Sequence, residues 1–347
     1  MGDISTQLAH TVAEAYRART PLKIRGGGSK ADVLGRDVEG TPLDIAEHSG
    51  VIDYNPAELV LTARAGTPIA EINKLLGEQG QQLPPETPAL AGKATLGGSL
   101  ACNHSGPARP WQGSLRDMVL GTRLINGRGE QLRFGGQVMK NVAGYDVSRM
   151  QAGALGTLAV ITELSLKVLP RPETTKTLAY SLSAHDALDV MRQRATEPRP
   201  LNAACWFEGT LYLRLSGAKA AVESTAQLWG GDSVEQPPWQ AIADGELPCL
   251  NQAGSLYRLS VPTGSALAPS DSVLIDWGGA QRWVYDQPEI VAAAVSERGH
   301  AWLYRGGDRK NETAPPLTRT QRQLHTALKN AMDPEGILNP GRLYSWL

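Results

Sequence analysis

A β-type run near the N-terminus breaks directly into three consecutive glycines, which strongly limits how this part of the chain can fold. Ile24 and Arg25 end the run, and the residues that follow are Gly26, Gly27, Gly28, Ser29 and Lys30. Without a Cβ atom, successive backbone N–H groups can converge on one anion. The stretch therefore predicts a turn able to hold a diphosphate, although a flexible glycine turn would show the same pattern. It matches neither G-x-G-x-x-G nor G-x-x-x-x-G-K-[ST], which excludes the two common phosphate-binding fingerprints.

A second stretch is dense in small and hydroxyl residues. It starts with Pro84-Pro85-Glu86-Thr87-Pro88 and continues from Ala94 to Gly106. Small residues are too frequent for a packed helix and apolar ones too sparse for a buried strand, so we expect a loop that closely approaches a ligand. Thr95, Ser99, Asn103 and Ser105 are its candidate hydrogen-bonding residues. A surface loop without a ligand is the alternative, although long loops in compact domains are usually functional.

A third stretch joins a polar, turn-rich segment to a glycine-punctuated strand. The segment is Met139-Lys140-Asn141-Val142-Ala143-Gly144-Tyr145-Asp146, and the strand follows Gly153 and Gly156 and runs through Ile161. This order would place the backbone of residues 156–161 beside the edge of a ligand. A core strand with tight turns would explain the same residues, and this stretch alone does not decide between the two.

The chain alternates β-type runs and helical patterns, which indicates an α+β fold. We expect a helix over 5–19 capped by Ser5, a helix from Ile69 that ends at Gly77 or Gly80, and strands at 22–25, 59–65, 120–125 and 158–169. Pro170-Arg171-Pro172 predicts a boundary, because prolines on both sides of one residue end a strand. We therefore expect a first domain over 1–172, a second over 173–290, and a C-terminal segment over 291–347 that returns to the first.

The second domain is predicted to be a small antiparallel sheet covered on one face. One candidate hairpin joins 205–207 to 211–215 around Glu208-Gly209-Thr210, and another joins 273–277 to 282–285 around Gly278-Gly279. Helical patterns lie at 184–195 and 217–229, and the C-terminal segment has a further one at about 319–331. No internal repeat or low-complexity segment is present.

Charge and cysteine content restrict the possible partners. Lys and Arg number 34 against 35 Asp and Glu, which provides no bulk positive field for nucleic acid. Cys102, Cys205 and Cys249 are far apart and predict no metal or iron–sulfur site. The N-terminus lacks the pattern of a signal peptide and no run is long enough to span a membrane, so we expect a cytoplasmic protein that reaches a membrane only through partners.

Taken together and in this order, the three stretches resemble the FAD-binding half of the vanillyl-alcohol oxidase and p-cresol methylhydroxylase (PCMH) superfamily. That family shows an R-G-x-G-S/T loop, a T-[IL]-G-G segment with N-x-S-G, and a G-x-x-G-x-L-x-[VI]-I-T strand. The tail, from Asp333 to Gly341, is similar to the closing D-P-x-G-[IV]-x-N-P-G of the 2-hydroxyacid dehydrogenase branch. Within that branch, the runs Gly106–Trp111, Gly113–Asp117, 139–146 and Ile275–Gly279 resemble the FAD-binding subunit of three-subunit glycolate oxidases.

The resemblance implies a PCMH-type FAD-binding domain of two α+β subdomains with a smaller antiparallel cap domain. It implies FAD with its diphosphate on residues 25–30 and 95–106, its adenine half near 156–161, and its isoalloxazine facing the second lobe. The cofactor-binding residues would be Arg25, Gly26, Gly27, Gly28, Ser29, Lys30, Thr95, Gly97, Gly98, Ser99, Asn103, Ser105, Gly106, Gly156 and Ile161. Relatives with covalent FAD often carry a histidine in the first loop, whereas Ser29 follows Gly28 here, so we expect noncovalent FAD.

The candidate catalytic residues come from a stretch near the C-terminus and from two arginines. The related catalytic subunit carries an H-x-G-D-G-N-x-H motif, whereas the matching stretch here, Gly299–Asp308, keeps His300 alone. The candidates are His300 as a base and Arg305 or Arg282 as the anchor of a substrate carboxylate. We expect the chain to act on a small 2-hydroxy acid within a complex that contains a homologous catalytic flavoprotein and an iron–sulfur subunit. The alternatives are an assembly subunit whose flavin site is vestigial and a free-standing dehydrogenase.

Overall fold

The structure is a computed structural model that describes residues 2–84, 86–137, 145–265, 271–296 and 298–347. Residues 139–144 of the predicted polar segment lie outside the described residues. Two compact units share the chain: residues 1–104, 114–170 and 308–347 form the first, and residues 105–113 and 171–307 form the second.

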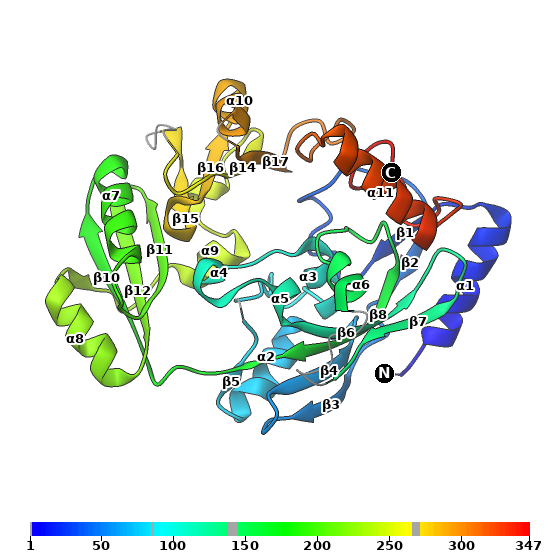
Figure 1. The fold of residues 1–347 in the computed structure, drawn as a ribbon, viewed down its shortest axis with the longest axis horizontal. Coiled ribbons are helices and arrows are strands. Elements are labelled where there is room, and N and C mark those ends of the chain that lie inside the picture. Colours follow the sequence, from blue (N-terminus) through cyan, green and yellow to red (C-terminus); the bar gives the residue numbers. More distant parts are fainter. Residues whose placement is uncertain (1, 85, 138–144, 266–270, 297) are drawn as a thin grey trace. The chain divides into compact units, whose positions relative to one another are not determined.

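The first unit is built on a five-stranded sheet in the order β3-β4-β8-β6-β7, all neighbours antiparallel (Figure 1). Its strands are β3 (Val51–Asn55), β4 (Val60–Arg64), β6 (Val119–Ile125), β7 (Gln131–Gly135) and β8 (Val160–Lys167). Two further pairs are β1 (Leu22–Arg25) with β2 (Thr41–Asp44), which run parallel, and β5 (Gln81–Gln82) with β9 (Leu169–Pro170). The helices are α1 (Ser5–Ala18), α2 (Ile69–Glu78), α3 (Leu96–Cys102), α5 (Leu115–Met118), α6 (Tyr145–Met150) and α11 (Arg319–Met332).

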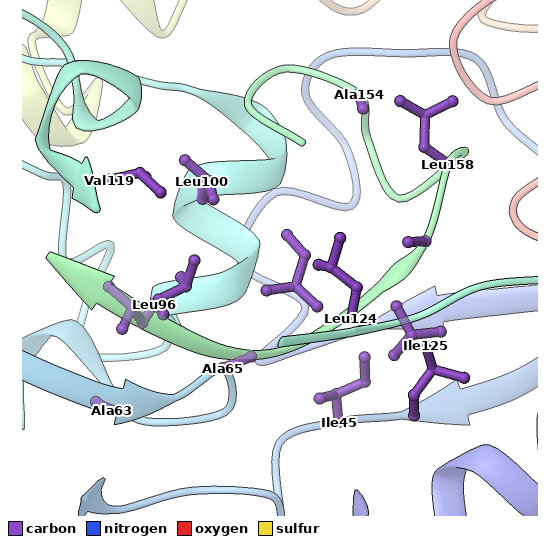
Figure 2. Close-up of a cluster of buried hydrophobic side chains, with 14 of the residues drawn as sticks. Ile45, Ala63, Ala65, Leu96, Leu100, Val119, Leu124, Ile125, Ala154 and Leu158 are labelled. Carbon is purple, nitrogen blue, oxygen red and sulfur yellow. The ribbon is translucent and has the colours of Figure 1, made fainter. Parts of the chain in front are cut away.

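An apolar core stabilises this unit. Figure 2 shows Leu96 and Leu100 of α3 among side chains from the sheet, including Val119 and Leu124 of β6. Helix α1 forms where predicted, but Ser5 is its first residue and not its cap. Ile4 takes the cap position without a side-chain hydrogen bond, and Asp3 accepts the hydrogen bond of the Ser5 N–H at 2.9 Å.

The second unit contains an eight-stranded sheet in the order β13-β10-β12-β11-β15-β16-β14-β17. Its strands are β10 (Thr174–Ser181), β11 (Leu201–Phe207), β12 (Thr210–Gly217), β13 (Asp232–Ser233), β14 (Leu256–Ser260), β15 (Leu274–Asp276), β16 (Gln281–Tyr285) and β17 (His300–Arg305). The helices are α4 (Arg109–Gln112), α7 (Ala184–Ala195), α8 (Lys219–Trp229), α9 (Trp239–Asp244) and α10 (Pro288–Ser296), with 3₁₀ turns η1 (Pro248–Leu250) and η3 (Trp277–Gly279).

Both predicted hairpins form in this sheet. Phe207 pairs with Thr210 across Glu208 and Gly209, which both have positive φ (49° and 79°), as a two-residue hairpin turn requires. Asp276 pairs with Gln281 across the second turn. The unit extends to Gly307, beyond the boundary at 290 expected from the sequence, because β17 pairs with β14.

The expectation that helices cover this sheet on one face only is wrong. Helix α7 and Leu213 of β12 share an apolar cluster on one face. Trp239 of α9 lies on the other, where its indole N–H donates to Thr177 at 2.8 Å and Arg214 stacks over its ring. Thr177 pairs with Arg214 across the strands, so both side chains point away from the apolar cluster.

Candidate functional site

The first glycine stretch forms a turn at the end of β1, as predicted. A Cβ atom on Gly26 would lie 2.3 Å from the Thr95 hydroxyl, and one on Gly27 would lie 1.8 Å from the Lys93 carbonyl oxygen. These two glycines therefore allow the turn to pack directly against residues 93–95. Gly28 differs, because its φ is +70° and a Cβ there would meet no protein atom within 4 Å. Gly28 thus presents bare backbone to open space.

The second stretch contains a helix where we expected a loop. Thr95 caps α3 by accepting a hydrogen bond from the Gly98 N–H at 3.4 Å. A Cβ on Gly97 would lie only 2.6 Å from the Cβ of Ala65, so the helix passes very close to the segment after β4. The small residues serve close helix-to-strand packing, which is compatible with a short helix, and the expectation of a loop over 96–102 is wrong.

The turn after β1 and helix α3 border one cavity of about 450 Å³. Protein ligand sites are commonly 300–1,000 Å³. Other parts of its wall come from the turn before β8 and from the C-terminal tail. Eleven predicted cofactor residues line it: Arg25, Gly26, Gly27, Gly28, Ser29, Lys30, Thr95, Gly97, Gly98, Gly156 and Ile161.

The remaining four predicted residues lie elsewhere. Ser99 is buried behind the wall, with its hydroxyl 3.5 Å from the Lys30 ammonium. Asn103 ends α3 in a left-handed conformation (φ 47°), and its buried side-chain oxygen finds no hydrogen-bond partner among the described residues. Ser105 and Gly106 belong to the second unit, where the Gly106 carbonyl accepts the Trp277 indole N–H at 3.1 Å.

Cationic side chains supply positive charge to the cavity. Lys30 lines it although only 8% of the residue is exposed. Arg342 also lines it; burial lowers the pKa of its guanidinium, and Arg309 lowers it further. Asp37 partly balances Arg342 at 3.9 Å. Lys23, Arg25, Lys30 and Arg342 outnumber Asp32 and Asp37 among the lining residues, so an anionic ligand would meet a net positive charge there.

Arg309 and Arg342 also stabilise the cavity wall through hydrogen bonds to backbone carbonyl groups. Arg309 donates hydrogen bonds to the carbonyl oxygens of Asp32, Leu34 and Gly35. Arg342 donates to the Ala31 carbonyl at 3.1 Å and to that of Arg36 at 2.6 Å. The C-terminal stretch therefore holds the segment that follows the glycine turn.

Asn339 connects the C-terminal tail with β1 and with the turn before β8, which all contribute to the cavity wall. The sequence analysis did not identify it as a site residue. Its side-chain oxygen accepts the Ile24 N–H at 2.7 Å, and its side-chain nitrogen donates to the Leu155 carbonyl at 2.8 Å. A Cβ on Gly156 would lie 2.7 Å from that nitrogen, so Gly156 is needed for this contact. The tail motif pointed to Asn339 only as a family signature. Nothing in the local sequence connects Asn339 with Ile24, 315 positions away, or with Leu155, 184 positions away.

Cys102 is a second residue that sequence reasoning left outside the site. It is the last residue of α3, is half-buried, and lines the cavity. Among the described lining residues it is the one thiol, and no histidine accompanies it.

The candidate catalytic residues do not converge. Arg282 is fully buried and pairs with Ile275 and Leu259, which belong to apolar clusters of the second unit. His300 pairs with Ser260 on the opposite face of the same sheet, since Ser260 neighbours Leu259. Arg305 donates to the Asn251 side chain at 2.9 Å. Within the described residues, no three potential metal-ligating side chains gather, and no helix is long and apolar enough to cross a membrane.

Comparison with known proteins adds to this geometry. The sequence model of the family described as FAD binding domain matches residues 5–135. Alkyldihydroxyacetonephosphate synthase, a solved structure, superposes with a TM-score of 0.68 over 96% of this chain and 75% of its own, at 16% identity. The family match and this shared fold confirm the predicted PCMH-type α+β fold.

Curated relatives narrow the assignment. The glycolate oxidase subunit GlcD of Bacillus subtilis is 29% identical over 52% of this chain and 37% of its own length. The glycolate oxidase subunit GlcE of Escherichia coli is 43% identical over 350 aligned positions, which cover 99% of both chains. The chain belongs to the family of the glycolate oxidase subunit GlcE.

Proposed function

We propose that this chain is the FAD-binding subunit of a glycolate oxidase complex. The single observation that carries the proposal is the cavity beside the glycine turn, where Gly28 presents open backbone and Lys30 and Arg342 supply positive charge. FAD fits this arrangement, because a diphosphate needs closely approaching N–H groups together with nearby cations. Residues 25–30, Thr95, Gly97, Gly98, Gly156 and Ile161 would hold the cofactor, with Arg342 and Asn339 added by the structure.

When bound, FAD accepts a hydride and releases electrons to a further carrier. The protein's own contribution is to bind and orient the cofactor. We propose noncovalent binding, because Ser29 stands where some relatives carry a linking histidine.

The onward path of the electrons would lie in partners. Cys102, Cys205 and Cys249 are far apart in the sequence, and the described part of the chain gathers no set of three metal ligands. A homologous catalytic flavoprotein and an iron–sulfur subunit would oxidise the 2-hydroxy acid and carry the electrons away. The complex would work on the cytoplasmic side of the membrane, which it would reach through these partners.

The test is to purify the chain alone and together with both partner subunits, and to compare flavin absorbance and glycolate-dependent dye reduction. We expect a flavin spectrum from the chain alone and robust dye reduction only from the complex. A colourless chain in a fully active complex would favour an assembly subunit with a vestigial site. Full turnover by the isolated chain would favour a free-standing dehydrogenase.

A further inference from the structure

Helix α11 and the end of the chain form a surface of the first unit that the proposed FAD site does not use (Figure 1). Residues 319–324, the first part of α11, are all exposed. The second part of the helix is anchored, because Leu328 and Met332 pack in the apolar core of the unit. Lys329 adds a buried ion pair with Asp333. The exposed start of α11 therefore contributes little to the core.

This exposed start is kept helical by its own cap. Thr318 accepts a hydrogen bond from the Gln321 N–H at 3.3 Å, and the Gln321 side chain accepts one from the Thr318 N–H at 2.9 Å. Such a reciprocal cap satisfies N–H groups that a helix start otherwise leaves without a partner. A surface that is already ordered loses less conformational entropy when a partner binds.

Trp346 lies beside α11 and is held there by ring contacts. Its ring stacks on that of Tyr344, with the ring centres 5.3 Å apart. The Arg322 guanidinium lies 4.5 Å from the centre of the Trp346 ring. Tyr344 in turn meets His325 of α11 edge to face, at 6.0 Å between ring centres. Trp346, which is half-buried, and Arg322 are therefore positioned together.

Positive charge and unused hydrogen-bond donors distinguish this surface. Arg319 and Arg322 lie three positions apart, on one side of a helix that contains no Asp or Glu. Among the described residues, neither guanidinium has a carboxylate within ion-pair distance, and the Trp346 indole N–H has no acceptor. Glu312 accepts hydrogen bonds from the N–H and hydroxyl of Ser345 instead. We call Arg319, Arg322 and Trp346 the α11 docking surface.

We propose that the α11 docking surface binds an acidic segment of another protein chain, with carboxylates on Arg319 and Arg322 and a further acceptor on the Trp346 indole N–H. A guanidinium presents a planar fork that matches a carboxylate. Arginine and tryptophan are also the residues that most often dominate the binding energy of protein interfaces. That the other chain is a subunit of a glycolate oxidase complex rests on the proposed function.

A neighbouring cavity limits where the partner's charges can lie. Trp346 borders an open cavity of about 490 Å³, and Asp37 and Glu39 line the same cavity. Their charges would repel carboxylates, so the acidic side chains of the partner belong on α11 and not in this cavity. A basic partner segment that reaches Glu39 is the opposite arrangement, which the experiment distinguishes.

Two other occupants fit the charge of this surface less well. A symmetric contact with a second copy of the chain would place the same arginines opposite each other, and like charges across an interface repel. Surfaces that bind anionic lipid typically gather about four to eight Lys and Arg residues. The α11 docking surface has Arg319 and Arg322, which favours a protein partner over a membrane.

The test measures by calorimetry how tightly the flavin-loaded full chain binds the co-expressed pair of partner subunits. A variant that combines Arg319→Gln with Arg322→Gln should bind this pair about 10- to 100-fold more weakly, because charge-assisted hydrogen bonds are lost. Raising the salt concentration should weaken binding by wild type more than binding by this variant. Trp346→Phe, which keeps a ring but loses the indole N–H, should weaken binding by a smaller factor.

Matched controls separate docking from folding. Arg133→Gln removes an exposed cation from β7 and should leave partner binding unchanged. Glu39→Gln should not weaken it either. The thermal midpoint and flavin content of the combined arginine variant should equal those of wild type, because both arginines are exposed and neither lines the FAD cavity.

Three results would overturn the proposal. The first is equal partner binding by wild type and the combined arginine variant, and the second is loss of binding in Glu39→Gln. The third is binding to vesicles of phosphatidylserine and phosphatidylcholine that the arginine variant loses while it keeps its partner, which would assign the surface to a membrane. The flavin spectrum of the chain and the dye reduction of the wild-type complex report separately on the proposed function, since neither depends on where the subunits touch.

Discussion

The Lys329 ammonium donates a 2.7 Å hydrogen bond to the Asp333 carboxylate, and 6% of the lysine and 0% of the aspartate side chain are exposed. The same ammonium donates to the carbonyls of Thr157 and Leu338. Asp333 also accepts the backbone N–H groups of Ile337 and Leu338. This fully hydrogen-bonded pair joins the end of α11 to the tail and to the turn before β8, where the tail contributes Asn339 to the cavity.

Lys329→Met should destabilise the first unit strongly. Removing one partner of a buried pair leaves the other charge uncompensated, which typically costs about 3–5 kcal/mol. Burial lowers the pKa of Lys329 and Asp333 opposes that shift, so the attraction to Asp333 helps the lysine stay charged. Urea unfolding of the variant checks the cost. The matched control is Lys219→Met, whose lysine lies 3.9 Å from Glu223 with both side chains more than half exposed; it should change stability by about 1 kcal/mol or less.

Asn339→Ala should reduce flavin content more than it reduces stability. The substitution removes the hydrogen bonds to the Ile24 N–H and the Leu155 carbonyl, so two parts of the cavity wall lose their common support. We expect folded protein with a lower flavin-to-protein ratio, measured by absorbance after purification. Asn311→Ala, which removes an exposed bond to Asp308, is the control. Equal flavin content in the two variants would show that Asn339 does not shape the site.

Gly27 and Gly28 should behave differently when each is replaced by alanine. A Cβ atom on Gly27 would strike the Lys93 carbonyl and not the cavity. Gly27→Ala should therefore lower the thermal midpoint. Gly28→Ala meets no protein atom but carries a left-handed φ, a strain of about 1–2 kcal/mol. This strain should lower the thermal midpoint less than the Gly27→Ala clash does, and the added methyl group, which stands where a ligand would approach, should weaken FAD binding. Thermal midpoints and FAD titrations of both variants separate the two effects.

These cases show what sequence could and could not predict. The glycine turn, the strand after Gly156 and both hairpins follow from local patterns, because turns and alternation are set within a few residues. Helix α3 was missed because its small residues are needed for close packing against a segment far away in the sequence, as Gly97 is against Ala65. Asn339 and Arg342 join the site only through tertiary contacts. Arg282, a candidate carboxylate anchor, lies on the opposite face of the sheet from His300, because strand register decides the face and local sequence does not determine that register.

Acid precipitation should release all flavin into the supernatant. The prediction follows because Ser29 stands where some relatives carry a linking histidine. The structure adds a control, because Cys102 lines the cavity and is a second side chain that could form a covalent link to the flavin. Wild type and Cys102→Ser should give the same colourless pellet. Yellow colour retained by the wild-type pellet and lost in Cys102→Ser would identify a thioether link and contradict noncovalent binding.

His48 should make stability fall as the pH drops below neutrality. Its side chain is fully buried, and its Nδ1 accepts the Ile4 N–H at 3.2 Å, which requires that nitrogen to be unprotonated. Desolvation lowers the pKa of His48 below its ordinary value of 6.5, and the charge of Arg64 adds to this, while Asp3 and the Thr162 backbone act in the opposite direction. Because the folded pKa lies below the unfolded one, the contribution of His48 is fully present above about pH 6.5 and is lost as the pH falls towards the folded pKa.

The thermal midpoint of wild type should therefore drop between pH 7.5 and 5.5, and the drop should be smaller in His48→Gln. His10→Gln, which replaces an exposed histidine of α1, should keep the wild-type drop, and an equal drop in all three proteins would assign the effect to other groups.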